Sequence, residues 1–201
     1  MFSSAEKKLW KAADDGKVED LRKILKKDAD VDINWRSPKE AGNQTALLLA
    51  CDKGHDAIIP LLLMHPDVDV NQKDREGATP FLGACVKGRT RCLQVLLQDM
   101  RVLVNEPGHG YTPLWCVASS GNLEIIRLWI ASGREMDLGQ PGNPMTDAVA
   151  KAHREGRREV VDLLQRFKEN PHLVRSDVLK GFELGQSLPF YNGVFNGFSI
   201  G

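Results

Sequence analysis

Histidines and cysteines are the residues of this chain best suited to acid–base, nucleophilic or metal chemistry. There are five histidines and four cysteines: His55, His65, His109, His153, His172, Cys51, Cys85, Cys92 and Cys116. No two histidines stand in an H-x-x-x-H or H-E-x-x-H spacing, and no two cysteines form a C-x-x-C pair. A zinc site usually shows such spacing, and no other constellation that a catalyst would need is recognisable. The sequence therefore predicts no metal site and no catalytic residue.

Phosphate-binding and nucleophile motifs are also missing, since the chain has no G-x-S-x-G, no P-loop and no G-x-G-x-x-G. The glycine-rich stretch 107–110 lies one residue before the pair Thr112-Pro113, so we interpret it as a turn. The neighbouring carboxylates Asp67 and Asp69 fall in a predicted loop, where solvation explains them. We expect the chain not to be an enzyme, to need no cofactor and to bind no small-molecule substrate.

The charge balance bears on the kind of partner. Lys and Arg number 27 and Asp and Glu number 27, so the formal net charge is zero. Binding to nucleic acid or to an anionic membrane needs a surplus of cationic side chains, and we expect neither partner. The longest apolar run, at 58–64, is interrupted by Pro60 and is far too short to span a bilayer. The first residues also lack the apolar core of a signal peptide.

The cysteines indicate a cellular compartment. Cys51 and Cys85 each lie three residues before a recurring glycine, in an apolar helical pattern. Unpaired cysteine behaves as a small hydrophobe, so core packing is the favoured interpretation, with disulfides or zinc as alternatives. We therefore predict a reducing compartment, either the cytosol or the nucleus.

The elements that would position these residues recur along the chain. Four threonines, Thr45, Thr79, Thr112 and Thr146, are spaced by 34, 33 and 34 residues, and four glycines, Gly54, Gly88, Gly121 and Gly156, by 34, 33 and 35. Each threonine begins a short helix of small residues that ends near the glycine, and a second apolar run of helical period follows. A fixed period of this size predicts stacked repeats.

The repeat resembles the ankyrin family, whose G-x-T-P-L-x-x-A motif stands here as Gly77-Ala78-Thr79-Pro80-Phe81-Leu82-Gly83-Ala84 and again at 110–114. The resemblance implies an all-α solenoid of about five helix-turn-helix repeats with projecting loops, called fingers. We place the repeats roughly at 4–34, 35–71, 72–105, 106–138 and 139–170, followed by a tail at 171–201. The first and fifth repeats are rich in charge, as terminal caps should be.

Three local features depart from the family pattern. The histidine that usually follows Thr-Pro-Leu is replaced by Leu48, Leu82 and Trp115, so we expect apolar packing to supply the contact between repeats. In the fifth repeat Thr146-Asp147-Ala148 stands in place of Thr-Pro-Leu. Pro60 falls within the second helix of its repeat, close enough to the start that its cost should be mild.

Partners of ankyrin proteins usually bind the concave face, which fingers and first helices form. Mapped onto this chain, the resemblance implies these partner-binding residues: Trp35, Arg36, Lys73, Arg75, Glu76, His109, Tyr111 and Trp115. For Trp35 the alternatives are a hinge packed on the next repeat or an exposed contact. For Tyr111 and Trp115 they are a binding contact or an aromatic side chain packed on its neighbour.

The end of the chain differs in composition. A further short helix is expected between positions 172 and 185. Beyond it, Phe190 and Phe195 stand among glycines with no helical period. This stretch is either flexible, packed on the last repeat, or an aromatic segment that docks on a partner, and we include both phenylalanines among the candidate binding residues.

Taken together, the sequence predicts a non-catalytic protein–protein interaction module, an adaptor, scaffold or inhibitor, whose partner it does not identify. The alternative is a constitutive accessory subunit of a large multiprotein assembly, docked partly through the aromatic tail. A third hypothesis is an enzyme or regulatory fragment whose activity depends on residues that form no recognisable motif.

Overall fold

The computed structural model describes residues 4–28, 30–37 and 41–183. These residues form five helix pairs and one further helix, and they contain no strand beyond an isolated bridge between Gly108 and Tyr111. The pairs are α1 (Ser4–Asp14) with α2 (Val18–Lys27), α3 (Ala46–Lys53) with α4 (Ile59–Leu63), α5 (Pro80–Val86) with α6 (Thr90–Leu96), α7 (Pro113–Ser120) with α8 (Leu123–Ser132), and α9 (Ala148–Arg154) with α10 (Arg158–Glu169). A 3-10 turn, η1 (Ala41–Asn43), precedes α3, and α11 (Pro171–Glu183) follows α10. The predicted all-α repeat solenoid is confirmed.

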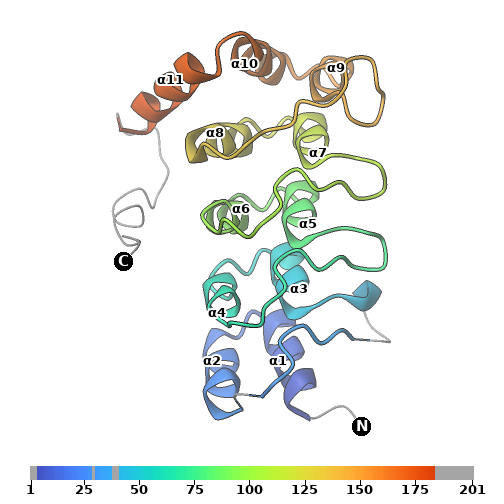
Figure 1. The fold of residues 1–201 in the computed structure, drawn as a ribbon, viewed down its shortest axis with the longest axis vertical. Coiled ribbons are helices and arrows are strands. Elements are labelled where there is room, and N and C mark those ends of the chain that lie inside the picture. Colours follow the sequence, from blue (N-terminus) through green and yellow to red (C-terminus); the bar gives the residue numbers. More distant parts are fainter. Residues whose placement is uncertain (1–3, 29, 38–40, 184–201) are drawn as a thin grey trace.

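The pairs stack so that the first helices form one column and the second helices another (Figure 1). Contacts join α1 to α3, α3 to α5, α5 to α7 and α7 to α9, and in the second column they join α4, α6, α8 and α10 in order. The loops between pairs project to one side of the first-helix column. Each pair thus buries its apolar face against its neighbours, which gives a continuous core along the stack.

Threonine caps explain where three of the first helices begin. The backbone N–H of Leu48 donates to Thr45 Oγ1 at 3.2 Å, and that of Leu82 donates to Thr79 Oγ1 at 3.2 Å. Trp115 N–H donates likewise to Thr112 Oγ1 at 3.3 Å. Each bond satisfies a donor that the helix itself leaves unpaired.

The fifth repeat begins one residue later than the threonine spacing predicts. Asp147, not Thr146, caps α9, because its Oδ1 accepts from the Ala150 N–H at 2.8 Å. The Thr146 hydroxyl instead accepts from the Gln140 N–H at 3.2 Å and so closes the preceding loop. In α4, Pro60 lies in the first turn as predicted.

Hydrogen bonds between repeats come from asparagines at the start of three loops, Asn34, Asn71 and Asn105. Asn34 donates to the carbonyl of Asp67 at 2.7 Å and accepts from the Asp69 N–H at 2.8 Å. Asn71 makes the same pair of bonds to the next loop, both at 2.8 Å. The prediction that apolar packing would replace the missing histidine is thus only part of the account: Leu48 and Leu82 are buried, and the asparagine amides add polar links.

The cysteines belong to the core. All four are free; Cys51, Cys85 and Cys92 are buried and Cys116 is half-buried. Burial raises the pKa of the Cys92 thiol to about 12 and that of Cys116 to about 11. Both thiols are therefore protonated at neutral pH. Because the thiolate is the reactive form of cysteine, neither side chain is a strong nucleophile there.

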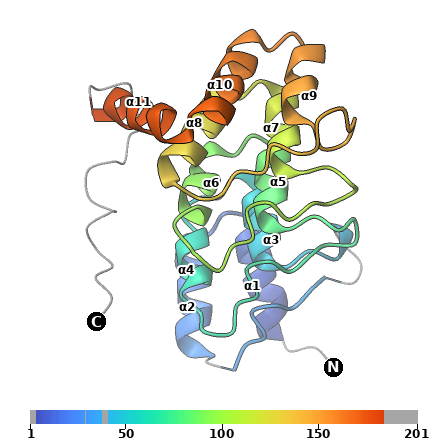
Figure 2. The same cartoon turned by 45° about the horizontal axis from the view of Figure 1, so that its top comes forward.

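The chain turns back after the fifth pair. Helix α11 packs against α8 and α10 instead of extending either column, as Figures 1 and 2 show from two angles. Val174 is buried in this contact, and Arg175 donates to the Ala131 carbonyl at 3.4 Å. Within the described part of the chain, no helix has the length and apolar character needed to cross a bilayer.

Candidate functional site

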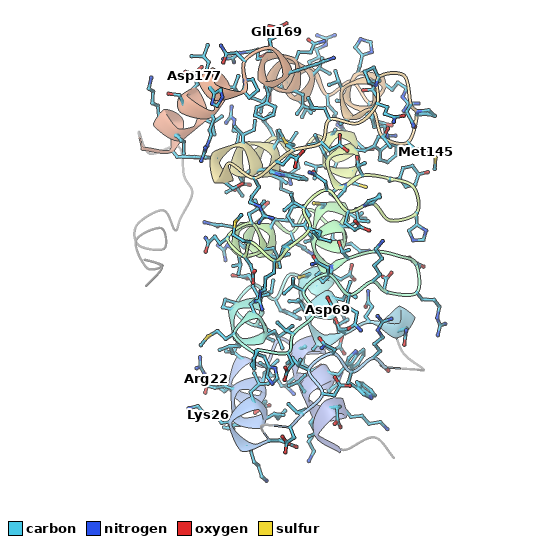
Figure 3. All side chains as sticks on the ribbon, in the orientation of Figure 1. Arg22, Lys26, Asp69, Met145, Glu169 and Asp177 are labelled. Carbon is cyan, nitrogen blue, oxygen red and sulfur yellow. The ribbon has the colours of Figure 1, made fainter. Side chains whose placement is uncertain are left out.

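Three fingers, at 71–78, 105–111 and 138–146, form one side of the molecule, and the first two carry half of the side chains predicted to bind a partner. They project in a row beside the first-helix column (Figures 1 and 3). Asn71 and Asn105, at the start of the first two fingers, bond to the backbone just before the next finger, so the fingers form a connected edge of the molecule. Side chains from successive repeats come together on this edge.

At the N-terminal end of this edge, Trp35 is packed away from solvent. Its side chain is 6% exposed and lies in a small cluster with Trp10 and Leu49. Of the two alternatives for Trp35, the structure agrees with the packed hinge. Almost none of the Trp35 side chain is available to a partner. Arg36 is half-buried, with its guanidinium against the side-chain amide of Gln72.

In the middle of the edge, opposite charges on successive fingers face one another. Lys73 and Glu106 form an ion pair at 2.5 Å, and His109 Nε2 lies 3.6 Å from a Glu76 carboxylate oxygen. Exposed pairs of this kind contribute at most about 1 kcal/mol to stability. Their main effect is to leave little unpaired charge here. The side chain of Arg75 is exposed, while its backbone N–H donates to the Gly42 carbonyl at 3.1 Å.

At the C-terminal end, two aromatic residues stack across the finger and the first helix of the fourth repeat. The rings of Tyr111 and Trp115 lie 4.3 Å apart between centroids, with an interplanar angle of 27°. Lys151 of α9 places its ammonium 4.6 Å from the Trp115 ring centroid. We call Tyr111, Trp115 and Lys151 the aromatic cluster. All three side chains are half-buried, so they pack on one another and still present surface to solvent.

The aromatic cluster is fixed to the next repeat by a hydrogen bond. Trp115 Nε1–H donates to the Pro144 carbonyl at 3.0 Å, and Arg154 donates to the same oxygen at 3.2 Å. Indole N–H groups that are partly buried usually need such an acceptor. The orientation of Trp115 is therefore set by the fourth and fifth repeats together.

Sequence reasoning missed Met145, which lies next to the cluster. This side chain is 40% exposed and projects at the tip of its finger (Figure 3). A Cβ placed on Gly110 would be 3.0 Å from Met145 Cε, so the methionine also borders the preceding finger. No periodic pattern covers this Pro-rich loop, and only the exposure of an apolar side chain reveals it.

Cations outnumber free carboxylates beside the aromatic cluster. Lys151 and Arg154 lie on α9, and the carboxylate of Glu155 directly follows this helix. Glu155 is already engaged, since its Oε1 lies 2.6 Å from Lys151 Nζ, and this hydrogen bond holds its pKa below the ordinary value. The cluster is thus an apolar surface with a cationic border.

The described residues contain no group of three His, Cys, Asp or Glu side chains that could hold a metal ion. Of the remaining nominated residues, Phe190 and Phe195 lie outside the residues that the structure describes.

The geometry of capped helix pairs, fingers and bridging asparagines agrees with a family comparison, in which the model for ankyrin repeats (three copies) matches residues 9–106. The chain belongs to the ankyrin-repeat family. It is 36% identical over 89 residues to the ankyrin repeat protein YahD of Escherichia coli, which covers 42% of this chain and 44% of that protein.

Two further relatives of this ankyrin-repeat chain have different names. SMC5-SMC6 complex localization factor protein 1 of Homo sapiens is 37% identical over 102 residues, or 48% of this chain and 9% of that protein. The 60 kDa lysophospholipase of Mus musculus is 33% identical over 159 residues, or 79% of this chain and 27% of that protein. The chain thus spans less than half the length of each of these relatives. What these differently named proteins share is a fold. Because one fold can carry several functions, the function of this chain has to be argued from its site.

Proposed function

We propose that this ankyrin-repeat chain is a non-catalytic interaction module that binds a protein partner through its fingers and first helices, centred on the aromatic cluster. The observation that carries the proposal is the pair Tyr111 and Trp115, stacked at 4.3 Å and still half-exposed. Tyrosine and tryptophan dominate interaction hot spots because each buries a large area at the cost of few rotatable bonds.

The aromatic cluster is suited to binding because its geometry is set before a partner arrives. The bond from Trp115 to the Pro144 carbonyl and the stack with Tyr111 already fix both rings. Ordering side chains on association costs about 0.5–1.5 kcal/mol for each flexible one, and pre-ordered rings avoid most of that cost. Met145, with its flexible thioether, can adapt to the partner's shape at the border.

The same surroundings favour one class of partner. Apolar contact is available at Tyr111, Trp115 and Met145, and cationic contact at Lys151 and Arg154. We infer that the partner presents an apolar side chain flanked by carboxylates. This places the most important contacts at the fourth and fifth repeats, not at the buried Trp35.

The proposal includes the absence of catalysis and an intracellular setting. The described residues hold no group of three His, Cys, Asp or Glu side chains suited to a metal ion, and the ankyrin family generally serves as an interaction module. The free thiols support a cytosolic or nuclear location, because an oxidising compartment would favour disulfides.

A second candidate is a role as a subunit of a larger protein assembly. It is supported by the relatives whose printed name is SMC5-SMC6 complex localization factor protein 1. An adaptor would exchange partners and be recovered in substoichiometric amount, whereas a fixed subunit would co-purify with the same components at constant stoichiometry. Native mass measurement of the purified endogenous complex separates the two.

Affinity capture with quantitative mass spectrometry tests the proposed face. The bait with Tyr111→Ala and Arg75→Ala is compared with wild type and with a matched control, Arg22→Ala in α2, after circular dichroism has shown that each is folded. Loss of a hot-spot contact of about 2 kcal/mol corresponds to roughly 30-fold weaker binding, so specific partners should be depleted by the finger variant alone. Undiminished capture by that variant, or equal loss with Arg22→Ala, would refute the proposal.

A further inference from the structure

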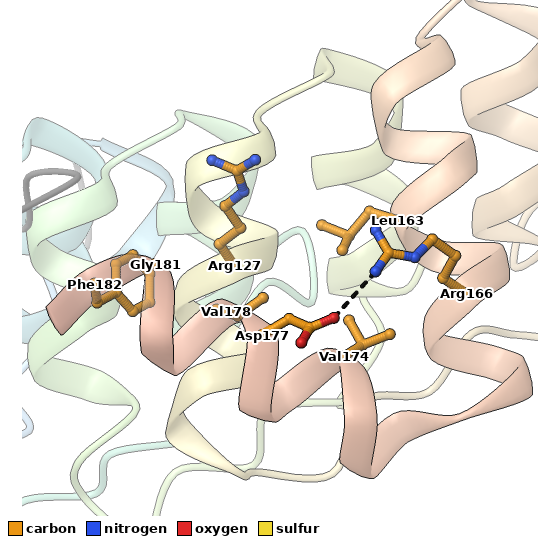
Figure 4. A pocket seen from close by; sticks show the side chains of 8 residues that line it. All are labelled: Arg127, Leu163, Arg166, Val174, Asp177, Val178, Gly181 and Phe182. Atoms are coloured by element: carbon orange, nitrogen blue, oxygen red, sulfur yellow. Dashed lines mark hydrogen bonds and ion pairs between the residues drawn. The ribbon is translucent and has the colours of Figure 1, made fainter. Parts of the chain in front are cut away.

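A groove lies between α8, α10 and α11 (Figure 4). These three helices stand on the side of the molecule away from the fingers (Figure 1). It encloses about 160 Å³ and is lined by Arg127, Leu163, Arg166, Val174, Asp177, Val178, Gly181 and Phe182. A neighbouring recess toward the start of α10 shares Arg127, Leu163 and Arg166 with it. The two hollows adjoin at these three side chains.

The groove combines an apolar floor with one unpaired cation. Leu163 and Val174 are buried at its base, and Val178 and Phe182 are half-buried at its side. Arg166 is engaged with Asp177 at 3.2 Å, which Figure 4 marks, and lies 4.0 Å from Asp162. Arg127 forms no ion pair with another residue in the described part of the chain. A segment that fits here should be apolar and able to contact a guanidinium without adding a positive charge.

The chain supplies such a segment at the end of the groove. Helix α11 ends at Glu183, and its last turn, with Gly181 and Phe182, lines the groove. The following residues, 184–201, contain no Asp, Glu, Lys or Arg but include Phe190, Tyr191, Phe195 and Phe198. Extended, 18 residues reach at most about 60 Å, so every part of the groove is within reach.

We propose that residues 184–201 dock in this groove of their own chain, with aromatic side chains on the floor and one ring against the Arg127 guanidinium. An arginine over an aromatic face contributes about 0.5–2 kcal/mol depending on desolvation. Tethering raises the local concentration of a short linked segment to the millimolar range, so weak contacts are enough for occupancy. This inference does not rest on the proposed partner-binding face, which lies at the fingers.

Photo-crosslinking in the full-length chain tests the docking. The photoreactive residue p-benzoylphenylalanine replaces Phe190, and equal amounts of ¹⁵N-labelled and unlabelled protein are mixed and irradiated. The expected products are crosslinks to peptides of α8, α10 and α11 within single isotopic chains. Arg127→Ala should lower their yield several-fold, and Lys26→Ala on α2 should leave it unchanged.

Three results would overturn self-docking: crosslinks between light and heavy chains, crosslinks chiefly outside these three helices, or a yield unaffected by Arg127→Ala. The first would mean exchange of the segment between two copies. If crosslinks form only after lysate is added, and only to another protein, the segment docks on a partner instead.

A second readout avoids the photoreactive residue. Phe190→Ser with Phe195→Ser in the full-length chain should accelerate amide hydrogen exchange across 158–183 several-fold and leave α1 and α2 unchanged. Unaltered exchange across 158–183 would contradict the docking.

Discussion

At the scale of single residues, Trp115 shows how one substitution within the family motif changes the surface. It occupies the position at which the ankyrin family usually has histidine, and its indole still makes a polar link, donating to the Pro144 carbonyl at 3.0 Å. The ring adds a face on which Tyr111 stacks and over which Lys151 lies. The inter-repeat hydrogen bond is retained by a residue that also provides contact area.

Asp14 provides a residue-scale test of stability against pH. Lys53 of the second repeat lies 2.7 Å from one carboxylate oxygen and Lys11 lies 2.9 Å from the other. These hydrogen bonds hold the pKa of Asp14 below its ordinary value of 3.8, and the bond from Lys53 has the larger effect. A carboxyl whose pKa is lower in the folded chain contributes stability above the unfolded pKa, and this contribution is lost as pH falls through the folded pKa.

We expect Lys53→Met to lower the free energy of unfolding at about pH 7 and to make it fall less steeply between about pH 5 and pH 2. Urea unfolding followed by circular dichroism across this range measures the effect. Lys26→Met, at an exposed position of α2, is the control and should keep the wild-type pH dependence. Parallel curves for wild type and Lys53→Met would show that the Lys53–Asp14 pair does not couple folding to pH.

At the scale of elements, the residue after a repeat glycine often reaches back to the previous repeat. Arg89 Nε donates to the Asp52 carbonyl at 2.9 Å, and Arg157 Nε donates to the Ser119 carbonyl at 3.3 Å. His55 Nε2 lies 3.1 Å from the Asp14 carbonyl oxygen. Each contact serves a carbonyl at the end of a first helix, where the helix provides no donor.

Two glycines allow the contribution of the Arg157–Ser119 hydrogen bond to stability to be measured. Gly121 and Gly156 both have positive φ, 77° and 68°, so alanine at either site costs about 1–2 kcal/mol from backbone strain alone. A Cβ at Gly121 would lie 2.6 Å from Arg157 Cδ, whereas one at Gly156 meets nothing within 4 Å. Gly121→Ala must therefore also displace Arg157 from Ser119.

We expect Gly121→Ala to destabilise the chain by about 1 kcal/mol more than Gly156→Ala, the usual value of one hydrogen bond. Chemical denaturation of the two variants gives the difference directly. Adding Arg157→Ala to each should remove it. Equal losses in the two single variants would mean that the arginine contact contributes nothing measurable.

Element positions followed from the sequence where a local signal existed. The threonine caps at Thr45, Thr79 and Thr112 and the early position of Pro60 were all predicted, because a cap is decided by a few adjacent residues. The start of α9 was misplaced by one residue, since Asp147 competes with Thr146 as the cap and only the loop geometry decides between them. The packing of α11 on α8 and α10 had no sequence signal, because it depends on contacts between distant segments.

At the scale of the whole molecule, stability should be local because each repeat touches only its neighbours. Leu96 of α6 is fully buried. We expect Leu96→Ala to cost roughly 2–5 kcal/mol. Amide exchange should accelerate most in α4, α6 and α8 and least in α1 and α11.

Leu103→Ala, at a side chain that is 53% exposed, is the matched control and should change the free energy of unfolding by less than about 0.5 kcal/mol. Uniform acceleration along the whole chain in Leu96→Ala would show instead that the stack unfolds as a single cooperative unit.

The candidate site was harder to predict than the fold. A period of 33 to 34 residues specifies stacked repeats, and the fingers follow from it. Whether Trp35 is buried, and that Tyr111 meets Trp115 while Met145 borders them, depends on side-chain packing between repeats, which spacing does not encode. The sequence therefore predicted the finger edge as the binding side of the molecule. It did not predict which residues come together on that edge.

Methionine footprinting tests the central claim, binding at the aromatic cluster, most directly. Met145 lies beside the cluster, whereas Met64 and Met100, 80% and 77% exposed, lie near the ends of second-column helices and serve as internal controls. The captured complex and the free chain are oxidised briefly with hydrogen peroxide, and sulfoxide is quantified at each site. Partner binding should slow oxidation of Met145 several-fold and leave Met64 and Met100 unchanged. Protection of Met64 or Met100 with Met145 unaffected would place the partner on the second helices and contradict the account.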